Sequence, residues 1–186
     1  QEILLCDDDG CPVPTGCEGE LYIRGTNTIQ GYYQAPELTA MHFTANGFWK
    51  SGDLGYCDEE GYIFLVDRKK EMIITGGYNV YATEVENCLN THPAVSNSAV
   101  VGMPDPTWGE AVCAVVVMHG GYRITREELI DHCKARLARH KAPKRVEFAD
   151  ALPLSAVGKV LRREVKKQLS TVADAESSSD RQNWSA

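Results

Sequence analysis

A chain of 186 residues with 43% hydrophobic residues is long enough to build a core, and this length fits one domain or one and a half small ones. The formal net charge of −7 argues against a dedicated nucleic-acid binder, which carries a net basic surface. The longest uninterrupted apolar run, Ala111 to Met118, is far shorter than the roughly 18 to 20 residues that cross a bilayer, so we expect no transmembrane segment.

The chain begins at Gln1 without a basic and apolar leader, and we expect it to be an internal piece of a larger protein. Its 7 cysteines, at positions 6, 11, 17, 57, 88, 113 and 133, include no Cys-x-x-Cys pair. The spacings among the first three do not fit a zinc hairpin. This pattern favours reduced thiols in a cytoplasmic protein over a disulfide framework or a metal site.

Residues 1–66 are predicted to be rich in β-structure. Strands are expected over Glu2 to Leu5, Glu20 to Arg24 and Tyr62 to Val66, separated by Gly, Pro and Asn residues and by an Asp-Asp-Asp-Gly turn. Such strands leave unpaired edges, so we expect neighbours from upstream sequence, or self-association through the exposed edges.

Beyond the charged run at 67–71 the pattern changes to mixed helix and strand. Thr83-x-x-Glu86 and Thr125-x-x-Glu128 both have the form of a capping box, each predicting a helix start. The first helix should end before Pro93. The second helix is expected to place Leu129, Ile130, Cys133 and Leu137 on one face.

Strands are predicted over the Val-rich segments Ser98 to Met103 and Ala111 to Met118, and over Lys144 to Phe148. A last short helix is expected over Val160 to Leu169. Together these elements predict an α+β domain with helices packed against a short sheet. The tail at 170–186 lacks apolar periodicity, and we expect it to be disordered.

Three motifs carry the functional prediction: Trp49 to Asp53, Asp67 to Val80, and Pro153 to Lys159. In this order they resemble the C-terminal third of the adenylate-forming enzymes, specifically the acyl-CoA synthetases, and the resemblance extends to about Leu169. It implies that residues 1–66 are the end of a large N-terminal adenylation domain, that 67–70 form a hinge, and that 71–169 form a mobile C-terminal domain.

The resemblance assigns Asp53 and Arg68 to nucleotide binding. A carboxylate can accept two hydrogen bonds from a ribose diol, and an arginine offers a planar fork of donors. Lys70 corresponds to the pivot of the hinge. The alternatives are an Asp that hydrogen-bonds its own turn and a solvated charged face.

Gly76 and Gly77 match the loop that lines the family's pantetheine tunnel, where the absence of Cβ atoms lets a narrow ligand pass. The alternative is an ordinary tight turn. Lys159 matches the lysine of acyl-adenylate formation, whose ammonium lowers the repulsion between a carboxylate and the α-phosphate. The alternative for Lys159 is a surface lysine.

The resemblance therefore predicts a ligase that uses ATP, CoA and Mg²⁺ to convert a carboxylic acid through acyl-AMP to a CoA thioester. Between Tyr122 and Arg145, Lys and Arg residues at 123, 126, 134, 136, 139, 141, 144 and 145 outnumber acids at 127, 128 and 131. They could attract CoA phosphates or form a solvated helix face. The family's triphosphate loop and acyl pocket are not found in the 186 residues of this chain. We therefore expect the chain to be inactive alone. The competing hypotheses are a non-catalytic interaction module and an adenylating enzyme with an acceptor other than CoA.

Overall fold

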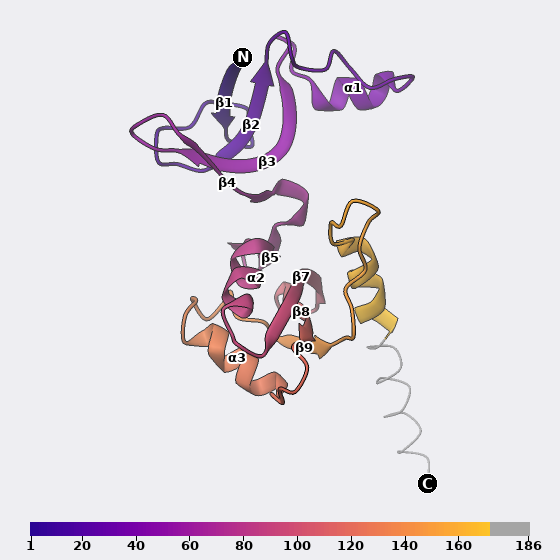
Figure 1. Ribbon diagram of the computed structural model, residues 1–186. Coiled ribbons are helices and arrows are strands. Elements are labelled where there is room, and N and C mark those ends of the chain that lie inside the picture. The colour runs from indigo at the N-terminus through magenta and orange to yellow at the C-terminus, as the bar shows by residue number, and fades with distance from the viewer. Residues whose placement is uncertain (172–186) are drawn as a thin grey trace. The chain divides into compact units, whose positions relative to one another are not determined.

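The computed structural model describes residues 1–171, in which the chain divides into two compact units, Gln1–Lys70 and a second beginning at Glu71 (Figure 1). Helices and antiparallel sheets both occur, and the α+β class predicted from the sequence is confirmed. No helix in the described part of the chain is both long and apolar enough to cross a membrane.

The first unit is an antiparallel sheet whose strands follow chain order: β1 (Glu2–Cys6), β2 (Gly19–Arg24), β3 (Trp49–Cys57) and β4 (Ile63–Arg68). The short helix α1 (Pro36–His42) precedes β3. A small core of Cys6, Tyr22 and Phe48 lies against the sheet.

Strand β3 was not predicted, because its glycines and polar residues resemble a turn. Pairing with both β2 and β4 makes it the longest strand of this sheet, at 9 residues. Asp53 therefore lies inside β3.

The second unit has a five-stranded sheet, with β6 (Tyr78–Val80), β5 (Ile73–Thr75), β8 (Gly109–Met118) and β7 (Val95–Asp105) in spatial order. Strand β9 (Arg145–Phe148) adds to β8 in parallel.

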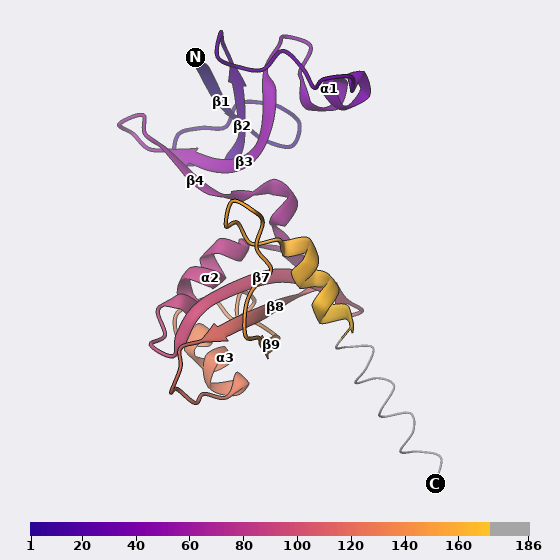
Figure 2. The ribbon, with the colours of Figure 1, turned by 45° about the vertical axis from the view of Figure 1, so that its right-hand side comes forward.

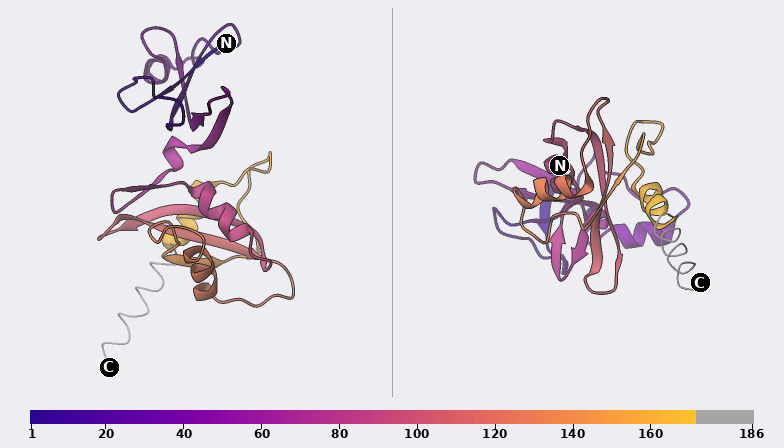
Figure 3. Two further views of the ribbon diagram at one scale, coloured as in Figure 1. Left: turned by 90° about the vertical axis from the view of Figure 1, so that its left-hand side faces the viewer. Right: turned by 90° about the horizontal axis from the view of Figure 1, so that it is seen from below.

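Helices cover both faces of this second sheet (Figures 1 and 3). Helices α2 (Ala82–Asn90) and α3 (Arg126–Lys134) pack on one face, and the helix at 162–171 packs on the other. Successive β8 side chains point to opposite faces, so alternate residues enter two cores. Val112, Ala114 and Val116 face α2 and α3, whereas Ala111, Cys113 and Val115 face the last helix. The continuous apolar run of β8 is the result.

One of the two predicted capping boxes is confirmed. The Thr125 hydroxyl accepts from the Glu128 backbone N–H at 3.1 Å, and the Glu128 carboxylate accepts from the Thr125 N–H at 2.8 Å. The box predicted at Thr83 is wrong, because the N-cap of α2 is Tyr81, two residues earlier, and Tyr81 makes no side-chain cap bond. The carboxylate of Glu86 instead accepts from the backbone N–H of Val100 at 2.8 Å.

The last helix extends slightly further than predicted. Ser170 and Thr171, expected to open a disordered tail, continue the helix, and their hydroxyls donate to the carbonyls of Lys166 and Lys167 at 3.0 Å. The rest of the predicted disordered tail, residues 172–186, lies outside the described residues.

Candidate functional site

An irregularity in β3 brings the two predicted nucleotide ligands together. Two steps along β2, from Glu20 to Tyr22, face four steps along β3, from Lys50 to Leu54, so β3 bulges at residues 51–53. Gly52 at φ +75° adopts the left-handed backbone that the bulge requires.

Asp53 lies directly opposite Arg68 in the register of β3 and β4. The Arg68 Nε is 2.7 Å from Asp53 Oδ1, and the Asp53 N–H donates to the Ser51 hydroxyl at 3.0 Å. A carboxylate and a guanidinium therefore stand side by side on the first unit. Their assignment to a nucleotide stays a prediction.

A pocket of about 490 Å³ in the first unit includes Arg68 in its wall. Two of its aromatic side chains are linked, since the indole N–H of Trp49 donates to the Tyr32 hydroxyl at 3.2 Å, and His42 packs edge-on to Tyr32. The lining residues are Glu20, Tyr32, His42, Trp49, Ser51, Gly52, Arg68, Lys69 and Lys70. Tyr32 and His42 were missed by sequence reasoning, because their segment has no periodic pattern.

The linker residues Lys69 and Lys70 differ in their surroundings. The Lys69 ammonium lies 2.8 Å from Asp8 and 3.0 Å from Glu20. The hydrogen bond to Asp8, with that to Glu20, raises the pKa of Lys69 despite its partial burial. Lys70 is exposed and forms no ion pair with any residue in the described range. Its pivot role is not tested by this geometry.

Gly76 and Gly77 form the two-residue turn of the β5–β6 hairpin, with φ values of +57° and +82°, as in a type I′ turn. The Gly76 N–H donates to the Trp108 carbonyl at 2.8 Å, and a Cβ on Gly76 would meet the Trp108 ring at 2.8 Å. The Lys144 ammonium lies 4.4 Å from the centre of the same ring. The turn is thus packed under an indole, whereas its role in a pantetheine tunnel stays a prediction.

Lys159 lies on a short loop before the last helix, and Figure 2 shows this loop projecting from the start of that helix. Leu154 pairs with Val160 across the loop, Gly158 has φ +77°, and the Lys159 N–H donates to the Ser155 hydroxyl at 3.1 Å. The Lys159 side chain is exposed, and no ion pair holds it within residues 1–171. Its ammonium is therefore presented to solvent on an ordered loop.

Arg162 was missed by sequence reasoning, yet it has more side-chain partners than Lys159. Its guanidinium lies 2.6 Å from Glu71 and 2.8 Å from both carboxylate oxygens of Glu86, and its Nε donates to the Val100 carbonyl at 3.3 Å. The sequence pattern predicted a capping-box role for Glu86 and therefore did not indicate its ion pair with Arg162. Arg162 joins the last helix, α2, β7 and the first residue after the linker.

Half of the eight cations in the basic segment at 123–145 form ion pairs. Four of its cations pair with acids at 2.7 to 2.8 Å: Arg126 and Arg145 with Glu147, Lys134 with Asp131, and Lys141 with Glu84. These pairs favour the reading of a solvated, ion-paired face over a dedicated phosphate site.

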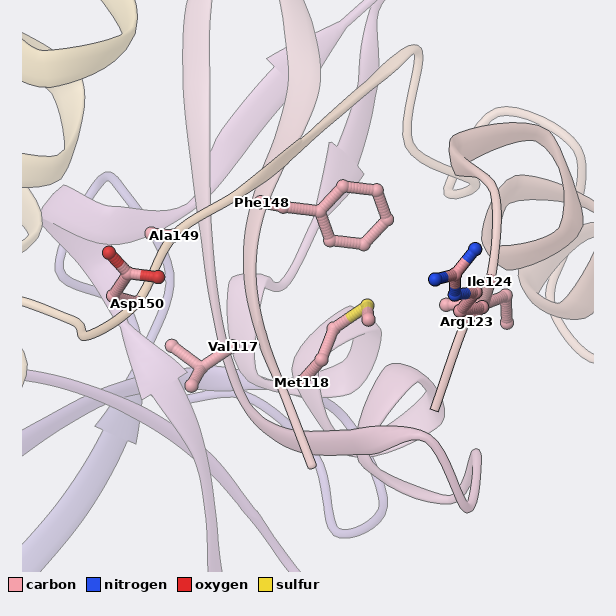
Figure 4. Close-up of a pocket in the computed structure, with 7 residues that line it drawn as sticks. All are labelled: Val117, Met118, Arg123, Ile124, Phe148, Ala149 and Asp150. Atoms are coloured by element: carbon pink, nitrogen blue, oxygen red, sulfur yellow. The ribbon is translucent and has the colours of Figure 1, made fainter. Parts of the chain in front are cut away.

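Arg123 borders a second pocket, of about 520 Å³, at the ends of β8 and β9 (Figure 4). Its other lining residues are Val117, Met118, Ile124, Phe148, Ala149 and Asp150.

All 7 cysteines are free thiols. Burial raises the pKa of Cys113 to about 11 and that of Cys133 to about 12, so both stay protonated and unreactive at neutral pH. Across residues 1–171 no group of three or more His, Cys, Asp or Glu side chains is placed to hold a metal ion.

Comparison with known proteins identifies the family. Residues 84–159 match the family model of the AMP-binding enzyme C-terminal domain. The feruloyl-CoA synthase of an Amycolatopsis species is 46% identical over 90% of this chain and 34% of its own length. The chain thus spans about a third of the length of the curated relatives it matches.

Solved structures agree with this match. The crystal structure of ATP-bound MatB from Rhodopseudomonas palustris has a TM-score of 0.86 at 37% identity, covering 90% of this chain and 33% of that one. Apo MatB gives 0.63 at 38% identity, over 90% and 34%. The amide bond synthetase McbA from Marinactinospora thermotolerans gives 0.82 at 40% identity, over 90% and 34%. The resemblance found in the motifs is confirmed: the second unit contains the C-terminal domain of the AMP-binding, adenylate-forming enzymes.

Proposed function

We propose that this chain is the C-terminal part of an ATP-dependent acyl-CoA ligase. In the first step a substrate carboxylate oxygen attacks the α-phosphorus of ATP and pyrophosphate leaves, giving acyl-AMP. In the second step the CoA thiolate attacks the acyl carbonyl and AMP leaves. The observation that carries the proposal is the pairing of Asp53 and Arg68 at 2.7 Å beside an aromatic pocket in the unit that precedes the linker.

Asp53 and Arg68 suit the ribose of the nucleotide. The carboxylate accepts hydrogen bonds from the two hydroxyls, and the guanidinium donates to ribose or phosphate oxygens. The indole of Trp49 and the phenol of Tyr32 add flat apolar surfaces in the same pocket. Mg²⁺ would accompany the triphosphate, and its ligands would come from residues outside this chain.

Lys159 supplies the cation for the first step. Attack of a carboxylate on a phosphate brings negative oxygens together, and a nearby ammonium lowers this repulsion in the transition state. Lys159 belongs to the second unit and the nucleotide ligands belong to the first, and the proposed way to bring the ammonium to the nucleotide is rotation about the linker at Lys70.

The test separates the two half-reactions in the full-length protein that carries this chain. Lys159→Ala should reduce acyl-AMP formation by about a hundredfold or more, measured as ATP–pyrophosphate exchange. It should largely preserve thioester formation from preformed acyl-AMP. Equal losses in both steps would refute the role assigned to Lys159. The 186 residues alone should give no exchange, because they lack the triphosphate loop.

The main alternative to a CoA ligase is an adenylating enzyme that transfers the acyl group to a different acceptor. McbA is an amide bond synthetase, and it matches this chain nearly as well as the ligases do. An adenylating enzyme with an amine acceptor is therefore the second candidate. Incubating the full-length protein with ATP, the acid and either CoA or an amine, and identifying the product by mass spectrometry, distinguishes the two. A non-catalytic module would form no acyl-AMP in any mixture.

A further inference from the structure

The charge of Glu20 is unusual for its position. Within residues 1–171, Glu20 is the one charged residue that is buried, at 7% exposure. A buried carboxylate costs free energy unless each oxygen has a partner, so its contacts show what it holds in place.

The two oxygens of Glu20 have different partners. Oε1 accepts from the backbone N–H of Gly52 at 3.1 Å, at the centre of the β3 bulge. Oε2 lies 3.0 Å from the ammonium of Lys69, within the linker at 67–70. One side chain therefore joins two segments that are distant in sequence.

Both partners are adjacent to the proposed ribose ligands. Gly52 precedes Asp53, and Lys69 follows Arg68. The bulge has two extra residues and a left-handed glycine, so few backbone hydrogen bonds from β2 are available to fix it. The Glu20 carboxylate supplies one of those missing bonds from within β2.

We propose that Glu20 is a positioning residue. Its carboxylate fixes the β3 bulge through Gly52 and the linker through Lys69. Asp53 and Arg68 are thereby held in position to bind a ribose diol. The ribose part of this inference rests on the proposed function, whereas the positioning of the bulge does not. Glu20 is proposed to act through Gly52 and Lys69, its two hydrogen-bond partners.

Glu20→Gln keeps the size of the side chain but removes the charge and turns an amide donor towards Lys69. Lys69→Met removes the same contact from the other side. Glu59→Gln is the matched control, because Glu59 is an exposed acid in the β3–β4 turn of the same unit.

The first measurement is amide hydrogen exchange of the 186-residue chain by NMR. Glu20→Gln should speed exchange at Gly52 by about tenfold or more, the effect of weakening a hydrogen bond to a charged group, and leave the β1 amides unchanged. The control should change neither. Unchanged exchange at Gly52, or an equal increase at Gly52 and in β1, overturns the proposal.

The second measurement titrates AMP and 2′,3′-dideoxy-AMP into the full-length protein. Glu20→Gln and Lys69→Met should weaken AMP binding by about fivefold to tenfold and weaken binding of the dideoxy nucleotide less, because the dideoxy nucleotide lacks the two hydroxyls that donate to Asp53. Equal weakening of both nucleotides overturns the ribose part. If the unaltered protein does not prefer AMP, the ribose assignment of the proposed function fails, and the exchange experiment still decides whether Glu20 fixes the bulge.

Discussion

Replacing Arg162 by Met should strongly destabilise the second unit. The guanidinium makes hydrogen bonds to Glu71, Glu86 and the Val100 carbonyl, and the Arg162 and Glu86 side chains are only 21% and 15% exposed. Removing one partner of a fully buried ion pair costs about 3–5 kcal/mol. Because part of this network reaches solvent, we expect about 2–4 kcal/mol, which lowers the urea midpoint by about 1–2 M for a unit of this size.

The assay is urea unfolding followed by circular dichroism and by tryptophan fluorescence, to which Trp108 of the second unit contributes. Arg163→Met is the matched control: Arg163 is the next residue of the same helix, but its side chain is 94% exposed and lies 3.6 Å from its partner Glu164. It should leave the midpoint unchanged. Adding Glu86→Gln to Arg162→Met should recover part of the loss, because the uncompensated carboxylate is then neutral. Equal midpoints for Arg162→Met and Arg163→Met would refute this reasoning.

Two further predictions use urea unfolding, and a third uses the half-reaction rates of the full-length protein. Gly76→Ala should destabilise the second unit by about 1 kcal/mol more than Gly77→Ala and alter the fluorescence of Trp108. Both glycines have positive φ, but only at Gly76 would a Cβ lie 2.8 Å from the indole. Equal losses of stability would contradict this. Burial lowers the pKa of His132 from 6.5, so its contribution to stability is complete above pH 6.5 and is lost as pH falls through the lower folded value. His132→Gln should flatten the acid dependence of the urea midpoint, and an unchanged slope would count against this assignment. Lys70→Pro fixes one backbone torsion of the linker, and in the full-length protein it should change the ratio of the two half-reaction rates; an unchanged ratio would exclude Lys70 as the pivot.

Local patterns predicted most of the second unit. The Val-rich runs became β7 and β8, and the hydroxyl-and-carboxylate pattern at Thr125 gave a true helix start. The same pattern at Thr83 failed, because a capping box is a local signal and Glu86 has stronger partners that are distant in sequence. Sequence alone cannot show that Arg162 faces Glu86.

The first unit was harder to predict for a related reason. Strand β3 has glycines at 52 and 55 and no β-branched residue, so its identity as a strand comes from pairing on both sides. The sequence predicted Asp53 as a nucleotide ligand but did not predict strand β3. It predicted Arg68 as a second ligand but did not predict the ion pair between the two. Their pairing at 2.7 Å depends on strand register, which neither motif contains.

The contacts on either side of Lys70 give a mechanical reason for a pivot at that residue. Lys69 is bound to the first unit through Glu20 and Asp8, and Glu71 is bound to the second unit through Arg162. Each neighbour of Lys70 is therefore held by charged side chains of its own unit, whereas Lys70 itself is exposed and forms no ion pair in the part of the chain that the structure describes. Torsional change in a chain is absorbed where the fewest contacts must break. If Lys70 is the pivot, Glu20 and Arg162 have matching roles: one keeps the nucleotide ligands fixed to the first unit, and the other keeps the Lys159 loop fixed to the second. A rotation at Lys70 would then move the Lys159 loop as a rigid body relative to Asp53 and Arg68.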